Sequence, residues 1–288
     1  MRKKKLSGFL STGFIVLVFL IGICLVAYPT VSNWWNERQA SHAIDDYHST
    51  VYSLDAEDQE ILYQGALAYN KYIESDPEHW FPDEAEKAIY NSTLNVSGDG
   101  VMGYLTVPKL EINMPIYHGT GDEALQLGVG HMEGSSLPIG GEGTHCVLSG
   151  HTGLASAKLF TKLDQMEVGD TFMLSVLSEE LTYQVVDIMV KLPEEMEFLE
   201  IQPFNDYCTL LTCTPYGVNT HRLLVRGERV KIPAAPSVPE PVIPEPPVEQ
   251  GLVVPGIVLW LILILLILLL ALFAVGLYRE FHQKKGGG

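Results

Sequence analysis

Two long hydrophobic runs constrain what this chain can fold into more than any other feature of its sequence. Residues 8–28 and residues 252–278 contain no charged side chain. Each run has about the ~20 apolar residues that an α-helix needs to cross a bilayer. A secretory signal peptide has a shorter apolar core of about 7–15 residues, followed by a small-residue cleavage site. We therefore interpret both runs as transmembrane helices, and the first one as an uncleaved anchor.

The charges next to the two runs predict how they are oriented. Residues 2–5 carry four positive charges ahead of the first run, and Arg279, Lys284 and Lys285 follow the second run. Positive charges next to a span stay in the cytoplasm. We therefore expect both termini in the cytoplasm and the residues between the runs outside the cell.

Between its basic ends the chain is strongly acidic. The sequence holds 35 Asp and Glu against 18 Lys and Arg, a formal net charge of −17, and setting aside the +6 of the two ends leaves −23. A nucleic-acid-binding protein needs a basic face to neutralise phosphates, so the composition excludes that class of function. With 47% hydrophobic residues, the chain is also too apolar to be disordered.

Changes in composition along the chain predict seven segments. Seven prolines among residues 233–250 indicate a semi-rigid polyproline stalk. The predicted segments are a basic cytoplasmic tip (1–7), a transmembrane helix (8–28), a helical N-terminal region (29–97), a catalytic domain (98–232), the stalk (233–250), a second transmembrane helix (251–278) and a cytoplasmic tail (279–288).

The segment outside the membrane begins with helix signals and then changes to strand signals. Apolar residues at spacings of three and four predict two short helices within residues 33–75, ended by Asp76-Pro77, and a third helix over residues 82–90. Beyond residue 98, short alternating runs between Gly- and Asp-rich turns indicate a mainly β domain, either a barrel or a sandwich. The predicted strands are 102–107, 114–117, 145–149, 171–176, 181–192, 207–212 and 221–230, with a helical turn within residues 153–165.

Three residues near the ends of these strands carry the chemistry of a nucleophilic enzyme. Cys213 ends a predicted strand, Arg222 lies across a short loop on the returning strand, and His151 follows the strand that ends at residue 149. A thiol needs a lowered pKa or a nearby base to attack a carbonyl group. The histidine can act as acid and base, and the arginine can hold a developing oxyanion.

The sequence around these residues resembles the sortases, the membrane-anchored cysteine transpeptidases of Gram-positive bacteria. The resemblance covers roughly residues 100–230 and lies in TLLTC (209–213), NTHR (219–222) and SGHTG (149–153). It implies a sortase-type eight-stranded β-barrel with N-terminal helices. GDGVMG (98–103), PIYHG (115–119) and GVGH (128–131), together with the second span, are similar to class C, the pilin-polymerising sortases.

This resemblance also implies a reaction. Cys213 would attack the threonine carbonyl of an LPxTG-like sorting signal and form a thioacyl intermediate. His151 would protonate the leaving amine, and Arg222 would stabilise the oxyanion or position the substrate. A lysine of the next pilin subunit would then resolve the intermediate. The alternative is a housekeeping-type sortase or a hydrolase, in which a cell-wall-precursor amine or water takes the place of that lysine.

Class C sortases often carry a lid, an Asp-Pro-aromatic motif that plugs the active site. Here Asp76-Pro77 is followed by Glu78-His79 before the aromatic pair Trp80-Phe81, which departs from that motif. The lid hypothesis places Asp76 toward Arg222 and Trp80, or else Phe81, over Cys213, within residues 76–82. The alternative is an ordinary loop that follows a helix.

The sequence gives less support to two other functions. A zinc site built from Cys146, His151, Cys208, Cys213 and His221 lacks the usual ligand spacing, so we expect neither a metal nor another cofactor. An anchored adhesin or pilin subunit would need an LPxTG-like motif before its C-terminal span, where the sequence is VEQG (248–251).

The remaining cysteines and histidines are expected to be structural. In the sortase barrel Cys146 and Cys208 would lie on neighbouring strands and point away from the active-site face, because strand side chains alternate. We expect two buried free thiols, with a disulfide as the alternative. His118 and His131 are expected in loops or in the core, and His42, His48 and His79 on solvated surfaces.

Overall fold

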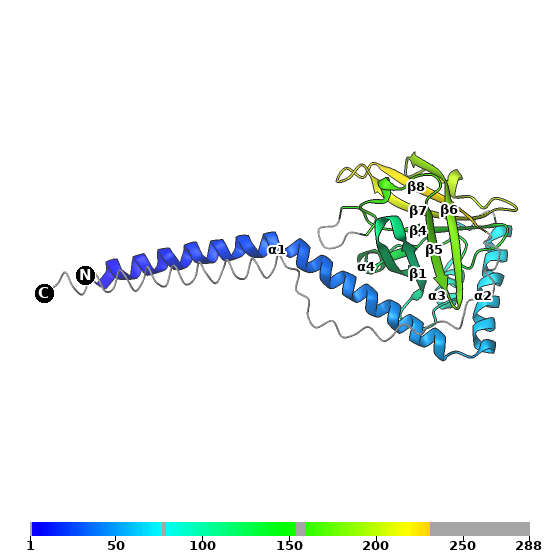
Figure 1. Cartoon of the computed structure of the whole chain (residues 1–288), viewed down its shortest axis with the longest axis horizontal. Helices are drawn as coiled ribbons and strands as arrows, with labels where there is room; N and C mark the ends of the chain where they lie inside the picture. The colour runs from blue at the N-terminus through cyan, green and yellow to red at the C-terminus, as the bar shows by residue number, and fades with distance from the viewer. Residues whose placement is uncertain (1, 77–78, 154–158, 231–288) are drawn as a thin grey trace. The chain divides into compact units, whose positions relative to one another are not determined.

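Eight strands close into one barrel in the computed structural model, which describes residues 2–76, 79–153 and 159–230. Around the barrel the strands follow the order β1-β2-β3-β4-β7-β8-β6-β5. Figure 1 shows the barrel, with β1, β4, β5, β6, β7 and β8 labelled. The pairs β2–β3 and β4–β7 are parallel, and the other pairs are antiparallel. The strands are β1 (Val101–Val107), β2 (Ile112–His118), β3 (Val129–His131), β4 (Thr144–Ser149), β5 (Thr171–Val176), β6 (Glu179–Lys191), β7 (Asp206–Thr214) and β8 (His221–Arg229).

The eight-stranded barrel is confirmed, and each of the seven strands predicted from alternation overlaps an observed strand. The pattern missed β3, a strand of three residues with glycine at its centre, which is too short to show alternation. It also missed the short helix α4 (Asp122–Leu127) that precedes β3. The described part of the domain also contains three 3₁₀ turns: η1 (Pro108–Leu110), η2 (Leu163–Gln165) and η3 (Glu197–Leu199).

The N-terminal helices differ from the prediction in one respect. Helix α1 (Arg2–Ser53) continues through Pro29, so the first hydrophobic run and the first predicted short helix form one continuous element. Helix α2 (Ala56–Ser75) starts at Asp55, whose side chain accepts a hydrogen bond from the Asp58 amide (2.9 Å), and ends before Asp76 as predicted. Helix α3 (Glu84–Ser92) begins with a capping box between Asp83 and Glu86.

The chain divides into two compact units, and the barrel belongs to the unit that begins at Trp35. The part of α1 before Trp35 belongs to the other unit. Within the described residues, one helix is long and apolar enough to cross a membrane, over Val18–Ser53. The predicted stalk (233–250), second transmembrane helix (251–278) and cytoplasmic tail (279–288) lie outside the described residues.

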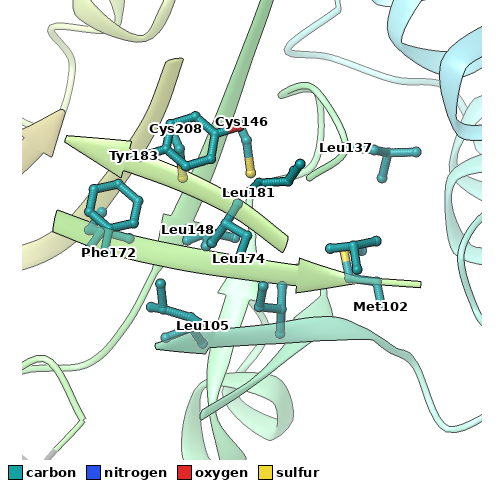
Figure 2. Close-up of a cluster of buried hydrophobic side chains, with 14 of the residues drawn as sticks. Met102, Leu105, Leu137, Cys146, Leu148, Phe172, Leu174, Leu181, Tyr183 and Cys208 are labelled. Carbon is teal, nitrogen blue, oxygen red and sulfur yellow. The ribbon is translucent and has the colours of Figure 1, made fainter. Parts of the chain in front are cut away.

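The barrel interior is filled by the inward-pointing side chains of all the long strands. Figure 2 shows Met102, Leu105, Phe172, Leu174 and Tyr183 in this core, together with the side chains of both buried cysteines. The Phe172 and Tyr183 rings stack with centroids 5.6 Å apart.

Buried and partly buried hydrogen bonds join helices α1 and α2 to the barrel domain. From α1, the Tyr47 hydroxyl donates to the Met102 carbonyl (3.1 Å) and accepts from the Leu177 amide (2.8 Å). From α2, the Asn70 amide group exchanges two hydrogen bonds with the backbone of Leu137 (3.2 and 2.7 Å). The region before the barrel is therefore joined to it by buried polar contacts as well as by apolar packing.

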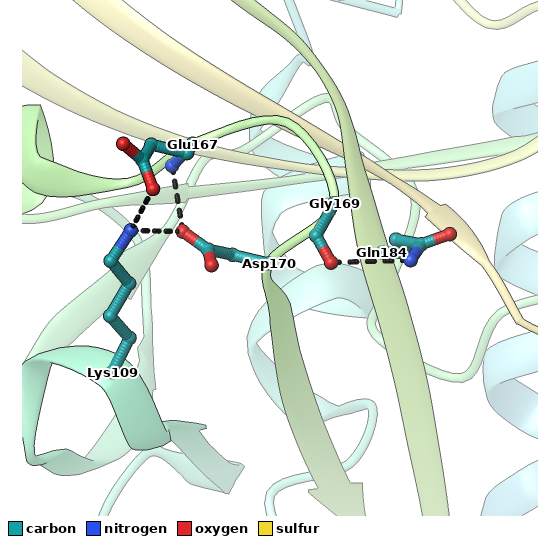
Figure 3. A network of polar contacts seen from close by, with 5 residues as sticks. All are labelled: Lys109, Glu167, Gly169, Asp170 and Gln184. Carbon is teal, nitrogen blue, oxygen red and sulfur yellow. Dashed lines mark hydrogen bonds and ion pairs between the residues drawn. The ribbon is translucent and has the colours of Figure 1, made fainter.

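A polar network on the surface joins the turn after β1 to the turn before β5 (Figure 3). Lys109 Nζ lies 2.8 Å from both Glu167 Oε2 and Asp170 Oδ2, and Asp170 also accepts from the Glu167 amide (2.7 Å). Hydrogen bonding to Lys109 lowers the pKa of Asp170. Because these groups are exposed to solvent, the network contributes little to stability.

Candidate active site

Cys213 and Arg222 are direct cross-strand partners on β7 and β8. The antiparallel register pairs Leu211 with Leu224 and Cys213 with Arg222, so both functional side chains lie on the outer face of the barrel. Both residues are half-buried. The arginine Nη1 donates to the carbonyl groups of Asn219 (3.2 Å) and His221 (3.1 Å), which fixes the guanidinium beside its own loop.

The loop between these two strands closes tightly. The amides of Val218 and Asn219 both donate to the Pro215 carbonyl (3.0 and 2.9 Å), and Asn219 has a left-handed backbone (φ 61°). Asparagine is one of the few residues that adopts this conformation readily. The turn brings Arg222 back beside Cys213 in few residues, as the sequence predicted.

His151 reaches the same end of the barrel from β4. Strands β4 and β7 are parallel neighbours, with Ser149 paired to Leu211. One residue before the histidine, the Gly150 amide donates to the Leu211 carbonyl (3.0 Å), and the Gly150 carbonyl accepts from Thr212 Oγ1 (2.7 Å). The backbone leading into His151 is therefore tied to the two residues that precede Cys213.

Gly150 also has no room for a side chain. A Cβ atom at this position would lie 2.6 Å from the ring of Phe160, which is fully buried. The Phe160 amide donates to the His151 carbonyl (3.0 Å). The close approach of this ring requires glycine and holds the backbone of the histidine in place.

An apolar cluster covers the outer face of the barrel next to Cys213. Its members are Val147, Leu199, Leu211 and Leu224, with Trp80, Met132, Met189, Met196 and Phe198 packed against them. Leu211 lies two residues before Cys213 and therefore points to the same side of β7. A surface of this kind can receive an apolar segment of a peptide substrate that leads to the thiol.

Trp80 is held on this cluster by Glu200, a residue that the sequence reasoning missed. The Trp80 indole N–H donates to Glu200 Oε1 (3.1 Å), and His79 Nε2 lies 3.5 Å from Glu200 Oε2. His79 Nδ1 donates to the Gly134 carbonyl (2.6 Å), since a carbonyl oxygen can only accept. No local sequence signal could have linked residues 80 and 200.

The expectation that His79 lies on a solvated surface was wrong. Its side chain is buried and bonded to the Gly134 carbonyl. The backbones of the two residues are also close, since a Cβ atom at Gly134 would lie 2.4 Å from the His79 carbonyl oxygen. His42 and His48 are exposed as expected, and the fully buried His131 belongs to the core. His118 is half-buried and bonded to the backbone of Gly100 and Thr93.

His145 is a second buried histidine on this face. Its Nδ1 donates to the Glu200 carbonyl (3.1 Å), and its Nε2 accepts from the Thr209 hydroxyl (2.8 Å), so the neutral ring satisfies both partners. Burial lowers the pKa of His145 to about 4, and the positive charge of Arg226 adds to this effect.

We expect this histidine to make the protein less stable in mild acid. Because its folded-state pKa lies below the value of about 6.5 in the unfolded chain, the unfolded chain binds the proton first as pH falls. Stability is thus complete above about pH 6.5 and decreases toward pH 4, by up to about 3 kcal/mol for this group. Urea unfolding at several pH values measures the decrease.

The variant His145→Asn is the matched control for this prediction. It keeps a donor near the Glu200 carbonyl but cannot titrate, so its unfolding free energy should depend less steeply on pH between 6.5 and 4. Burial also lowers the pKa of His118, so part of the slope should remain. Equal slopes in the variant and the wild type would contradict the role of His145.

Across residues 2–76, 79–153 and 159–230, no group of three or more His, Cys, Asp or Glu side chains is arranged to hold a metal ion. Cys146 on β4 and Cys208 on β7 lie in the barrel interior, whereas Cys213 lies on the outer face of β7, so the cysteines considered for a zinc site are on opposite sides of the barrel wall.

Comparisons with known proteins point to a single family. Residues 105–230 match the family described as "Sortase domain". Sortase C1 from Streptococcus agalactiae is 48% identical, with a TM-score of 0.63, over 66% of this chain and 98% of that structure. Sortase C from Clostridium perfringens, solved with a C-terminal cell wall sorting motif, is 43% identical, with a TM-score of 0.59, over 67% of this chain and 100% of that structure. The curated "Sortase A" of Streptococcus agalactiae is 26% identical over 80% of this chain and 89% of its own length.

Proposed function

This chain belongs to the sortase family of cysteine transpeptidases, and from that premise we propose that it polymerises pilin subunits as a class C sortase. Its donor substrate is an LPxTG-like sorting signal, and its acceptor is a lysine on the next pilin subunit. The observation that carries the proposal is the shared placement of Cys213, Arg222 and the His151 backbone at one end of a barrel whose structural relatives are sortases of class C.

In the proposed reaction the Cys213 thiolate attacks the threonine carbonyl carbon of the sorting signal. The carbonyl oxygen becomes an oxyanion, which Arg222 stabilises from the neighbouring strand. The bond to the glycine nitrogen breaks, and His151 gives a proton to that nitrogen. The products of this half-reaction are a thioester on Cys213 and a free glycine amine.

The second half-reaction restores the enzyme. The lysine amine of the acceptor subunit attacks the thioester carbon, and His151 takes the proton that the amine loses. The carbon–sulfur bond breaks, Cys213 leaves as a thiolate, and an isopeptide bond joins the two subunits. If water or a cell-wall-precursor amine attacked instead, the same residues would make a hydrolase or a housekeeping-type sortase.

One experiment separates these outcomes. The full-length protein is incubated with an LPxTG peptide or with a pilin subunit that carries this motif, and the products are examined by denaturing gel and mass spectrometry. We expect covalent ladders joined through lysine. Cleavage of the peptide without ladders would favour the hydrolase, and no cleavage by the wild type or by lid variants would contradict the proposed activity.

We further propose that the enzyme works outside the cell with both termini in the cytoplasm. The support is the apolar N-terminal part of α1 and the basic residues beside both hydrophobic runs. A protease added to intact cells should therefore reach the barrel but not epitope tags fused to either end.

The loop before α3 is proposed to act as a lid. Trp80 lies on the apolar cluster that contains Leu211, on the side of β7 from which Cys213 projects, and it is bonded to Glu200. A substrate that used this surface would have to displace the indole. The proposal also places Asp76 near Arg222. Asp76 directly follows the last residue of α2.

We expect Trp80→Ala to expose the thiol of Cys213. The variant loses the packing of the indole on the apolar cluster and its hydrogen bond to Glu200, which contributes about 1 kcal/mol. Alkylation of Cys213 by iodoacetamide should therefore be about five- to tenfold faster. Asp76→Ala should act in the same direction.

Phe81→Ala is the matched control, because that ring is next in sequence but 85% exposed. Its labelling rate should equal that of the wild type. Unchanged labelling in both Trp80→Ala and Asp76→Ala would mean that the loop is an ordinary connection after α2.

A further inference from the structure

The proposed reaction makes no use of the two cysteines inside the barrel. Cys146 on β4 and Cys208 on β7 are direct partners in the parallel register. Both point into the core, and their side chains are 2% and 0% exposed. Figure 2 shows the two sulfur atoms among the apolar side chains of the interior. In this structure both residues are free thiols, as expected from the sequence.

A buried histidine accompanies the pair. His131 is fully buried on β3, the strand next to β4 that carries Cys146. The ring is held by Tyr90, whose hydroxyl lies 2.9 Å from Nδ1, and by the Ser136 carbonyl, 2.8 Å from Nε2. Groups from α3 and from the loop after β3 therefore fix the orientation of this ring.

The two sulfur atoms do not have the same chemistry. Burial raises the pKa of Cys146, but the neighbouring Cys208 and His131 oppose this effect and lower that pKa. Burial and the neighbouring Cys146 raise the pKa of Cys208. The thiol with the lower pKa suits the role of nucleophile, and its neighbour suits the role of resolving partner.

The backbone spacing allows a bond between them. Adjacent strands lie about 4.8 Å apart, which falls within the Cα separation of about 4.4–6.8 Å that disulfides span. We propose that Cys146 and Cys208 are an oxidisable pair, which a small two-electron oxidant such as hydrogen peroxide converts into a disulfide that ties β4 to β7.

The chemistry balances with one molecule of peroxide. The sulfur of Cys146 attacks one peroxide oxygen, the O–O bond breaks, and a sulfenic acid and water are formed. The sulfur of Cys208 then attacks the sulfenic sulfur, its proton leaves with the hydroxyl group as a second water, and the disulfide results. Two thiols lose two electrons in total, and the peroxide gains them.

The bond would join the strands that position the candidate catalytic residues. His151 and Cys213 follow these cysteines along β4 and β7 at the same distance in sequence, and the closed loop would run from residue 146 to residue 208. Closing a long loop restricts the unfolded chain, so the oxidised protein should unfold at a temperature higher by roughly 5–15 °C.

The test uses the full chain with Cys24→Ala and Cys213→Ala, so that Cys146 and Cys208 are its only thiols. After treatment with peroxide, the protein is denatured and reacted with N-ethylmaleimide. We expect a mass decrease of about 2 Da, no maleimide adduct, a peptide pair cross-linked through residues 146 and 208, and a higher Tm. Dithiothreitol should restore two adducts and the original Tm.

The single variants Cys146→Ser and Cys208→Ser, made in the same background, are the controls. Neither should show the loss of 2 Da or the rise in Tm. Two adducts after oxidation of the parent, or oxygen added to either sulfur in place of the cross-link, would overturn the proposal. Because this background lacks Cys213, the result is independent of the transpeptidase activity.

Discussion

Replacing Cys213 by alanine is expected to lower kcat/KM for cleavage of an LPxTG peptide by at least about 10⁴-fold. The proposed reaction passes through a thioester on this sulfur, and in the described residues the outer face of β7 next to Arg222 presents no other thiol. The measurement is the release of the peptide fragment, combined with mass spectrometry of the trapped acyl-enzyme.

The matched control is Cys24→Ala, which removes a thiol in the first hydrophobic run. It should cleave the peptide at the wild-type rate. If Cys213→Ala folded with an unchanged Tm and still formed an acyl-enzyme, the assignment of the nucleophile would be wrong.

Replacing Arg222 by alanine should have the second largest effect, a decrease of about 10²–10³-fold. The residue is the cross-strand partner of Cys213, and its guanidinium is positioned by two carbonyl groups of the preceding loop. If the arginine stabilises the oxyanion, kcat should fall while KM changes little. A rise in KM with constant kcat would instead assign Arg222 to substrate positioning.

Two further variants test whether the effect is specific to the guanidinium of Arg222. Arg222→Lys keeps the charge but loses the planar fork of donors, so its activity should lie between those of the wild type and the alanine variant. Arg226→Ala removes a guanidinium that lies further along the same strand, bonded to Asp187 (3.0 Å) and stacked over Tyr207. Its kcat/KM should stay within a few-fold of the wild type, and a loss as large as that of Arg222→Ala would indicate a general charge effect.

Much of the barrel could be predicted because strand patterns are local. The alternation that identified residues 171–176 reproduces β5 to the residue, since each strand has one face in the core. The same reasoning failed where the signal is short or the contact is distant. Strand β3 has three residues, and the burial of His79 depends on a glycine far along the chain.

In the candidate site, too, contacts between residues close in sequence could be predicted and contacts between distant residues could not. The turn between Cys213 and Arg222 is short enough to read from the chain, so their pairing on adjacent strands was predicted. The Trp80–Glu200 hydrogen bond joins residues far apart in sequence, and it depends on how the loop before α3 packs over the barrel. Side-chain patterns do not encode such distant partners.

By itself, the sequence determined which segments are apolar enough for a membrane, which residues form most of the strands, and which side chains could act as nucleophile, acid or base, and oxyanion donor. These properties follow from composition and from periods of two or about four residues. The resemblance to sortases implied that the strands of Cys146 and Cys208 are neighbours. Only the tertiary structure decided that β4 and β7 run parallel, in a register that sets Cys146 opposite Cys208 and brings the backbone of His151 beside the residues that precede Cys213. Parallel pairing needs a long crossover, and its register depends on the packing of the whole barrel.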